Sequence, residues 1–204
     1  MERTLTTWFA DCLWHYRRIS VWERVLSRRD ETVPVDDGMR WATREDGRLL
    51  RQAGYSEVEL AARFATGCRP AVAVAQDELL AIGWYVPAAQ APRLYDWCRF
   101  VLPENGMWNF DLRVSPDRAG RGLRAPLMAF AHAELAREGY RYIHCLSDAS
   151  ATDDTRPCAT AGFIRVEELI FVSIASRAFL WMGRRYGRGQ WYPGNELVQP
   201  THRL

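Results

Sequence analysis

The chain has 204 residues, of which 48% are hydrophobic and 25% are charged, and its formal net charge is +2. This composition is typical of a globular protein, and the length suits one domain with extensions. The small net charge argues against a general nucleic-acid-binding protein, because such domains carry a strong basic excess on one face.

The first 37 residues are predicted to form an amino-terminal extension. Residues 21–26 continue it as strand or helix, and the pattern leaves both open. A connector over residues 33–38 leads into the main domain. Near the start of the extension, apolar and aromatic residues recur at helical spacing; they are Trp8, Phe9, Cys12, Leu13 and Tyr16.

Two short amphipathic helices are predicted after a first strand at residues 39–43. They cover residues 44–53 and 56–66, and Ser56 with Glu59 supplies a capping box for the second. Four strand-like segments follow and are expected to build an antiparallel half-sheet. They are residues 71–75, 79–86, 94–102 and 107–114, and the first two form a hairpin through Gln76, Asp77 and Glu78.

The segment from Val114 to Arg124 leads from the last of these strands into a helix through Gly120 and Gly122. A helix start leaves about four backbone N–H groups without intrahelical partners, and glycines let a phosphate approach the backbone. The arginines of the segment add positive charge; they are Arg118, Arg121 and Arg124. It is neither a P-loop nor a dinucleotide fingerprint, since Ala125 stands at the third glycine of the latter. The segment therefore predicts a pyrophosphate site of another kind.

The helix after this loop is predicted over residues 123–138, and Gly139 ends it. Its apolar stripe consists of Leu123, Leu127, Phe130, Ala131 and Leu135, with His132, Arg137 and Glu138 off the stripe. A buried strand at residues 142–146, a short helix at 154–161 and closing strands at 163–174 complete the predicted domain.

From residue 176 the chain becomes rich in arginine and aromatic residues. With the amino-terminal aromatics, this segment could bind a membrane surface or another protein. The alternative, which we favour, is that these aromatics cover the edge of the main sheet or form a subunit contact. A homodimer is therefore a possible assembly.

This order of elements resembles the GNAT acyl-CoA N-acyltransferases over roughly residues 38–174. The segments that carry the resemblance are residues 110–116, 120–123, the helix to Glu138, residues 142–147, and residues 157–163, which end in Gly-Phe. The phosphate loop of the family reads Gln/Arg-x-x-Gly-x-Gly/Ala. The aligned residues here are Ala119, Gly122 and Arg124, of which Gly122 fits the pattern.

The resemblance implies an α+β (α/β) GNAT fold, with a mixed, mostly antiparallel central sheet of about six to seven strands flanked by helices. It divides the chain into an extension at residues 1–37, an acyltransferase domain at 38–174 and an aromatic and basic extension at 175–204. The implied cofactor is acetyl-CoA or another acyl-CoA. The residues expected to bind it are Leu112, Arg113 and Val114, through amides near the thioester, and Arg118, Ala119, Gly120, Arg121, Gly122, Leu123, Arg124 and Ala125.

Acyl transfer to an amine requires that the amine first lose a proton. By the resemblance, Asp111 is the expected base. The alternative is that Asp111 pairs with Arg113, two residues along on the same strand face, and does no proton chemistry. Cys158 stands where the family carries a tyrosine acid, so it is expected to protonate the departing thiolate, unless it is a small buried hydrophobe. His144 and Ser147 are spare candidates.

Aromatic residues on the central strands are expected to line the acceptor pocket, although core packing explains each of them equally well. They are Trp84, Tyr85, Tyr95, Trp97 and Trp108.

The five cysteines are widely spaced and contain no Cys-x-x-Cys pair, which indicates neither a metal site nor a disulfide framework. They are Cys12, Cys68, Cys98, Cys145 and Cys158. Since no apolar run approaches the roughly 20 residues that span a bilayer, we expect a cytoplasmic protein without a transmembrane segment.

The expected function is the transfer of an acetyl or other acyl group from acyl-CoA to a primary amine of a small molecule, such as an amino sugar, by direct attack in a ternary complex. One alternative is a degenerate module that binds CoA or a protein partner without catalysis, supported by Ala119, Arg124 and Cys158. Another is acyl transfer from an acyl carrier protein that docks on the basic carboxy-terminal segment.

Overall fold

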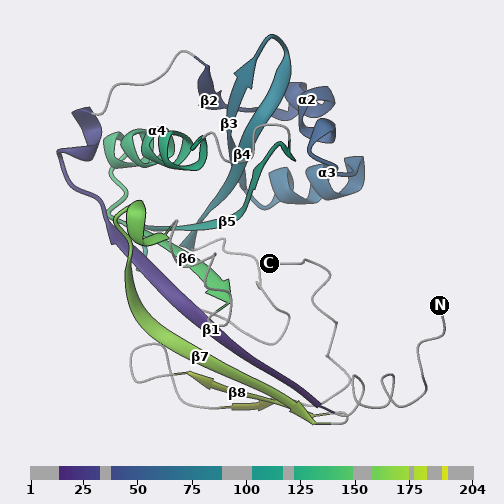
Figure 1. Ribbon diagram of the computed structural model, residues 1–204, viewed down its shortest axis with the longest axis vertical. Helices are drawn as coiled ribbons and strands as arrows, with labels where there is room; N and C mark the ends of the chain where they lie inside the picture. The colour runs from purple at the N-terminus through teal and green to yellow at the C-terminus, as the bar shows by residue number, and fades with distance from the viewer. Residues whose placement is uncertain are drawn as a thin grey trace.

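The computed structural model describes residues 14–32, 38–88, 103–116, 122–148, 158–174, 177–182 and 190–192. They form one twisted sheet with helices on both faces (Figure 1). The strands are β1 (Trp14–Val25), β2 (Met39–Trp41), β3 (Arg69–Ala75), β4 (Glu78–Pro87), β5 (Gly106–Val114), β6 (Tyr142–Asp148), β7 (Ile164–Ile174), β8 (Arg177–Met182) and β9 (Gln190–Tyr192). The helices are η1 (Asp30–Thr32), η2 (Arg44–Asp46), α2 (Gly47–Gln52), α3 (Glu57–Ala65) and α4 (Arg124–Arg137).

In the described part of the chain the sheet has nine strands, in the order β2-β3-β4-β5-β6-β1-β7-β8-β9. Neighbouring strands are antiparallel except β5 and β6, which are parallel. The predicted α+β fold with a mixed, mostly antiparallel sheet is therefore confirmed. The strand number exceeds the expected six to seven because β1, β8 and β9 come from the terminal segments.

Strand β1 lies inside the sheet, between β6 and β7. Its residues from Ile19 onward pair with β6, and its residues from Trp14 to Glu23 pair with β7, with a register shift after Val21. A helix at Tyr16 is therefore a wrong prediction, because Tyr16 lies in an extended strand and pairs with Val172 of β7. The rest of the predicted helix lies outside the described residues. The division of the chain at residues 37 and 174 stays a prediction.

The two helices predicted near Arg44 and Ser56 are present. The first begins as the 3-10 turn η2, which Thr43 and Asp46 cap reciprocally, and continues as α2. The Ser56 hydroxyl caps α3 by accepting a hydrogen bond from the Glu59 amide at 3.2 Å. The Glu59 carboxylate accepts from Arg63 on the next turn of α3, at 2.7 Å.

Helix α4 buries more of its surface than its predicted apolar stripe. Leu127, Phe130, Ala131 and Leu135 of that stripe are buried as expected. His132, expected off the stripe, is only 1% exposed, because Phe163 and the sheet residue Tyr85 pack near its ring. The turn after Glu138 ends the helix, and Gly139 adopts the left-handed φ of +94° that glycine tolerates.

The core consists of two apolar clusters, one on each face of the sheet. Leu127 and Leu135 of α4 pack on one face with Tyr85, and Leu50 of α2 and Leu60 of α3 pack on the other. Figure 1 shows α4 on one side of β3 and β4 and α2 on the other. No helix in the described part of the chain is long and apolar enough to cross a membrane.

Beyond β7 the sheet continues through β8 and β9, each antiparallel to the strand before it. The carboxy-terminal segment thus extends one edge of the sheet. The predicted strand at residues 94–102 and the start of the helix at 154–161 lie outside the described residues, while residues 158–160 of that helix are helical.

Candidate functional site

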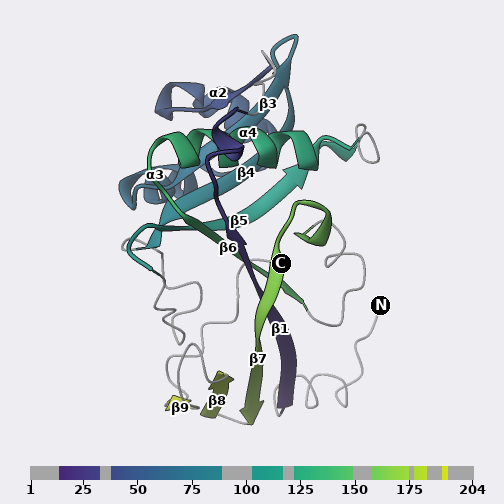
Figure 2. The same cartoon turned by 90° about the vertical axis from the view of Figure 1, so that its left-hand side faces the viewer.

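The parallel strands β5 and β6 separate after a short paired stretch. In the part of the chain that the structure describes, their pairing is limited to Gly106–Trp108 against Tyr142–His144. Beyond Trp108, β5 continues along β4 while β6 continues along β1. Both ribbon views show the two strands diverging from a common start (Figures 1 and 2). The divergence leaves one edge of β5 without pairing to β6 from Asn109 onward.

A β-bulge lies in β5 directly after the divergence. Trp84 of β4 pairs with Phe110 and Ile82 pairs with Arg113, so that Gly83 alone lies opposite Asp111 and Leu112. Asp111 has a φ of +54°, which is uncommon for a residue with a side chain. A Cβ at Gly83 would approach Leu112 Cδ1 to 3.1 Å, so a glycine suits this close approach.

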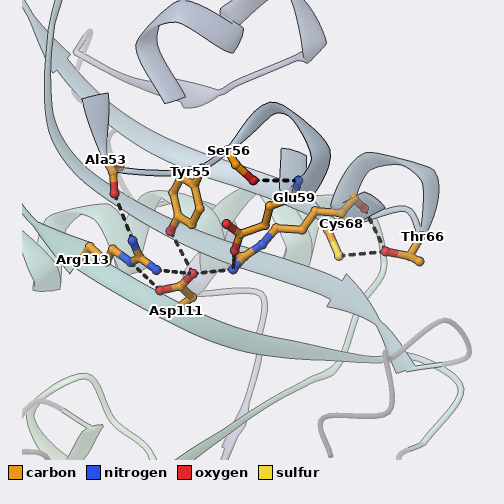
Figure 3. Close-up of polar contacts among 9 residues, drawn as sticks. Ala53, Tyr55, Ser56, Glu59, Thr66, Cys68, Asp111 and Arg113 are labelled. Carbon is orange, nitrogen blue, oxygen red and sulfur yellow. Dashed lines mark hydrogen bonds and ion pairs between the residues drawn. The ribbon is translucent and has the colours of Figure 1, made fainter. Parts of the chain in front are cut away.

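The Asp111 carboxylate accepts four hydrogen bonds from three side chains (Figure 3). Tyr55 Oη donates to Oδ2 at 2.9 Å, and Arg63 Nη2 donates to the same oxygen at 2.7 Å. Arg113 donates through Nε to Oδ1 at 2.6 Å and through Nη2 to Oδ2 at 3.1 Å. The predicted pairing of Asp111 with Arg113 is therefore confirmed, and two further donors join it.

These donors come from the segment that covers this face of the sheet. Tyr55 directly precedes the cap of α3, and Arg63 lies within α3. Arg113 also donates through Nη1 to the carbonyl of Ala53, at the end of α2, at 2.9 Å. The bulge of β5 is thus tied to α2 and α3 by hydrogen bonds, as Figure 3 shows for Ala53, Tyr55 and Arg113.

The guanidinium of Arg63 is buried among aromatic rings. Its Cζ lies 4.7 Å from the ring centroid of Tyr55, 4.8 Å from that of Trp84 and 5.2 Å from that of Phe110. These cation–π contacts offset part of the cost of burying the charge. Because Arg63 also pairs with Glu59, the cluster of Arg63, Arg113, Asp111 and Glu59 is formally neutral.

Burial alone would raise the pKa of Asp111, but hydrogen bonds from Arg113 and the charges of Arg63 and Arg113 bring it below its ordinary value of 3.8. Burial, together with the nearby Asp111 carboxylate, raises the pKa of Tyr55. Near neutral pH the cluster therefore holds an ionised carboxylate and a protonated phenol. Whether Asp111 accepts a proton in catalysis stays a prediction.

The predicted pyrophosphate loop is described from Gly122 onward. Gly122 is exposed and has a φ of +68°, and a Cβ there would meet no atom of the described residues within 4 Å. Leu123 is the N-cap of α4 and offers no side-chain cap. Arg124 and Ala125 are exposed on the first turn. Arg118, Ala119, Gly120 and Arg121 lie outside the described residues.

Cys158 contacts a second thiol. Its Sγ lies 3.6 Å from Sγ of Cys145, which is buried on β6. The hydrogen bond with Cys158, together with burial, raises the pKa of the Cys145 thiol. Cys158 itself is partly exposed and packs against the apolar cluster under α4. Its predicted role as a general acid stays a prediction.

The predicted substrate-binding aromatics divide between the two faces of the sheet. Trp84 and Trp108 are fully buried in the cluster under α2 and α3, whereas Tyr85 is buried in the cluster under α4. Tyr95 and Trp97 lie outside the described residues. Core packing accounts for the three described aromatics, and their contact with a substrate stays a prediction.

A buried carboxylate–histidine pair lies where β5 and β6 separate. His144 pairs in register with Trp108 of β5, the last such pair, and its Nε2 lies 2.9 Å from Oε2 of Glu23 on β1. Sequence reasoning named His144 but missed Glu23. Only the insertion of β1 beside β6 brings the two residues together. Tyr55 and Arg63 were missed for a similar reason. The pattern of apolar residues in a helix does not indicate that either side chain will contact a carboxylate on a distant strand.

No protein-family model matches the sequence, and no curated protein is found as a relative. Solved structures match the fold. A GCN5-related N-acetyltransferase from Sphaerobacter thermophilus is similar with a TM-score of 0.56 at 15% identity, over 85% of this chain and 57% of that one. For a GNAT-family acetyltransferase from Colwellia psychrerythraea the TM-score is 0.54 at 16% identity, over 85% of this chain and 61% of that one. For a tandem GNAT protein from the clavulanic acid biosynthesis pathway the TM-score is 0.50 at 13% identity, over 86% of this chain and 59% of that one.

The chain thus spans 57 to 61% of the length of these solved chains. Identities of 13 to 16% carry information about the fold rather than about a substrate. Within the described residues, the sheet has one parallel strand pair, which diverges, and a bulge on β5 beside it. The chain therefore has the GNAT fold.

Proposed function

We propose that the protein is an N-acyltransferase that transfers an acetyl or other acyl group from acyl-CoA to a primary amine of a small molecule. The observation that carries this proposal is the divergence of β5 from β6 immediately before the Asp111 bulge. An acyl-transfer site needs preorganised donors where the thioester oxygen gathers charge, and unpaired strand amides are such donors.

The start of α4 fits the phosphates of an acyl-CoA. The first N–H groups of a helix lack intrahelical partners, and Leu123 provides no side-chain cap for them. Gly122 is exposed, and among the residues that the structure describes none would lie within 4 Å of a Cβ at this position. Open backbone beside a helix start is a suitable anion site, to which Arg124 adds a positive charge.

The proposed reaction is a direct transfer. The amine nitrogen bonds to the thioester carbon, the carbon–sulfur bond breaks, and the sulfur leaves as a thiolate that takes up a proton. The proposed donors to the thioester oxygen come from the amides of Leu112, Arg113 and Val114. Successive strand amides alternate between the β4 side and the open side, so those that face away from β4 would serve, each worth roughly 3 to 4 kcal/mol in such sites. The amine nitrogen releases one proton in the same exchange.

The cofactor site is tested with Gly122→Glu, which places a carboxylate at the start of α4. Gly139→Glu is the matched control, because Gly139 also has a positive φ and open space but lies at the other end of the helix. We expect calorimetry to detect acetyl-CoA binding to the wild type and to Gly139→Glu, with a loss of about tenfold or more in Gly122→Glu. Equal affinities in the two variants would show that the site is misplaced.

Catalysis is tested by the release of free CoA thiol from acetyl-CoA in the presence of a panel of small amines. Turnover that depends on the amine supports an enzyme. Binding without turnover for any amine supports the alternative of a non-catalytic CoA-binding module, which the full engagement of Asp111 by arginines favours. A carrier-protein donor, the small-molecule acceptor and the cytoplasmic location stay predictions.

A further inference from the structure

We propose that Asp111 is a positioning residue, whose carboxylate is clamped by Tyr55, Arg63 and Arg113 so that the β5 bulge presents its amides toward the divergence from β6. In this role Asp111 does not accept the proton of the amine. The inference rests on the proposed acyl transfer for its catalytic consequence. The clamp itself is a property of the free protein and can be tested without a ligand.

The backbone of the bulge needs something to hold it. Asp111 adopts a φ of +54°, a backbone conformation that is unfavourable for residues with a Cβ. Such a conformation persists only where contacts with the surrounding structure hold it. Its place opposite Gly83 interrupts the register with β4, so strand pairing alone does not define the shape of the Asp111–Leu112 step.

The side chain of Asp111 supplies the missing restraint. Four donors at 2.6 to 3.1 Å connect it to the start of α3, to α3 itself and to the neighbouring Arg113. Arg113 is in turn anchored on the Ala53 carbonyl. Because α2 and α3 pack on the sheet through Leu50 and Leu60, the bulge is fixed to a rigid part of the fold.

The same contacts make Asp111 a poor proton acceptor. Both of its oxygens already accept hydrogen bonds, and two guanidinium groups, which do not release protons at working pH, face them. Hydrogen bonds and positive charges that favour the ionised form weaken a carboxylate as a base. An ammonium substrate that approached the carboxylate would also meet the cations of Arg63 and Arg113.

The decisive comparison is between Asp111→Ala and Asp111→Gly. Both variants remove the carboxylate, so the loss of a base contributes equally to both, and any difference between them reports the shape of the bulge. A positioning role predicts a difference, because glycine adopts the left-handed backbone without the penalty that alanine meets. We expect Asp111→Gly to exceed Asp111→Ala by about fivefold to 30-fold in kcat/KM and in acetyl-CoA affinity. Equal values in the two variants would overturn the proposal.

A milder variant keeps the proposal testable if Asp111→Ala and Asp111→Gly do not fold. Tyr55→Phe removes one donor to Asp111 and keeps the ring over Arg63. If Asp111 positions the bulge, we expect acetyl-CoA affinity and kcat/KM to fall together by about threefold to tenfold, with an unchanged pH profile. If Asp111 is a base, the loss of a donor raises its pKa, and the acidic limb of the pH profile moves to higher pH. That second result would contradict the proposal.

Hydrogen exchange separates this proposal from the proposed function. In the free protein, the amides of residues 110–114 are expected to exchange faster in Asp111→Ala than in the wild type, with Asp111→Gly and Tyr55→Phe in between. Unchanged exchange in Asp111→Ala would refute the clamp, whatever the protein binds. Faster exchange in a protein that does not bind acetyl-CoA would leave the clamp supported and the acyltransferase proposal refuted.

Discussion

The two faces of the sheet bury polar side chains in opposite ways. Under α2 and α3, the charged side chains of Arg63 and Asp111 meet each other at 2.7 Å. Under α4, His132 and Tyr85 are buried, and in the described part of the molecule neither the imidazole nitrogens nor the phenol oxygen have a hydrogen-bond partner. Of these buried side chains, those on the first face form a charged pair, and the two on the second face are neutral.

This difference has an electrostatic cause. An unpaired charge is too costly to bury, so a group without partners stays in its neutral form. Burial accordingly lowers the pKa of His132 to about 3 and raises that of Tyr85. On the other face, arginines keep Asp111 ionised despite burial. The paired face is thus suited to hold backbone in place near neutral pH, while the α4 face responds to acid.

The largest expected effect comes from breaking the paired cluster. Arg63→Leu leaves the buried Asp111 with fewer partners, and we expect a loss of about 3 to 5 kcal/mol in the free energy of unfolding. Arg40→Leu is the control, because the Arg40–Asp46 pair lies on the surface, with 48% of the Arg40 side chain exposed. Its loss should stay within about 1 kcal/mol in denaturant titrations. Similar losses in both variants would remove the contrast between buried and exposed pairs.

The second largest effect is expected from acid, which should lower the stability of the fold through the buried His132 on the α4 face. The folded pKa of His132, about 3, lies below its ordinary value of 6.5, so the unfolded state binds more protons between these values. Stability is therefore present above pH 6.5 and is lost as pH falls, by about 2 to 3 kcal/mol between pH 6.5 and 4.5. His132→Phe should abolish this part of the loss, measured by denaturant titration at each pH. If the free energy of unfolding of His132→Phe still fell by the same amount between pH 6.5 and 4.5, His132 would not be the cause of the loss.

The carboxylate on the paired face should titrate in a separate window. The folded pKa of Asp111 lies below its ordinary value of 3.8, so its contribution to stability is present above 3.8 and is lost only as pH falls further. Acid unfolding of His132→Phe should then begin at lower pH than that of the wild type.

A smaller effect tests whether the α4 face takes part in chemistry. If Cys158 protonates the departing thiolate, Cys158→Ala should lower turnover about tenfold with unchanged acetyl-CoA affinity, since water is a poorer placed donor. Cys145→Ala is the matched control, because it removes the other thiol of the contact. Equal turnover in the wild type and Cys158→Ala would assign Cys158 to packing alone.

The smallest effect concerns the cap that starts α3. Ser56→Ala removes the hydroxyl that accepts from the Glu59 amide, and it should cost about 1 kcal/mol of unfolding free energy. Because the cap directly follows Tyr55, acetyl-CoA affinity should fall slightly as well. Thermal unfolding with and without acetyl-CoA measures both quantities, and an unaltered melting temperature would mean that the cap contributes nothing.

Local patterns in the sequence were sufficient for the elements that neighbouring residues decide. The cap of α3 at Ser56, the hairpin of β3 and β4 through Gln76 and Asp77, and the end of α4 at Gly139 depend on contacts within a few residues. The order of motifs around Gly122 was sufficient to predict the GNAT fold. The pairing of Asp111 with Arg113 was also predictable, because two residues along a strand share a face.

Tertiary structure alone decided the rest. Strand β1 lies between β6 and β7, and Glu23 meets His144, because backbone pairing between segments more than 100 residues apart overrides a helical spacing of apolar residues. Tyr55 and Arg63 reach Asp111 from 56 and 48 residues away. A residue pattern reports which face of its own element is apolar, whereas the partner of a buried charge depends on how separate elements pack, and that information is not local.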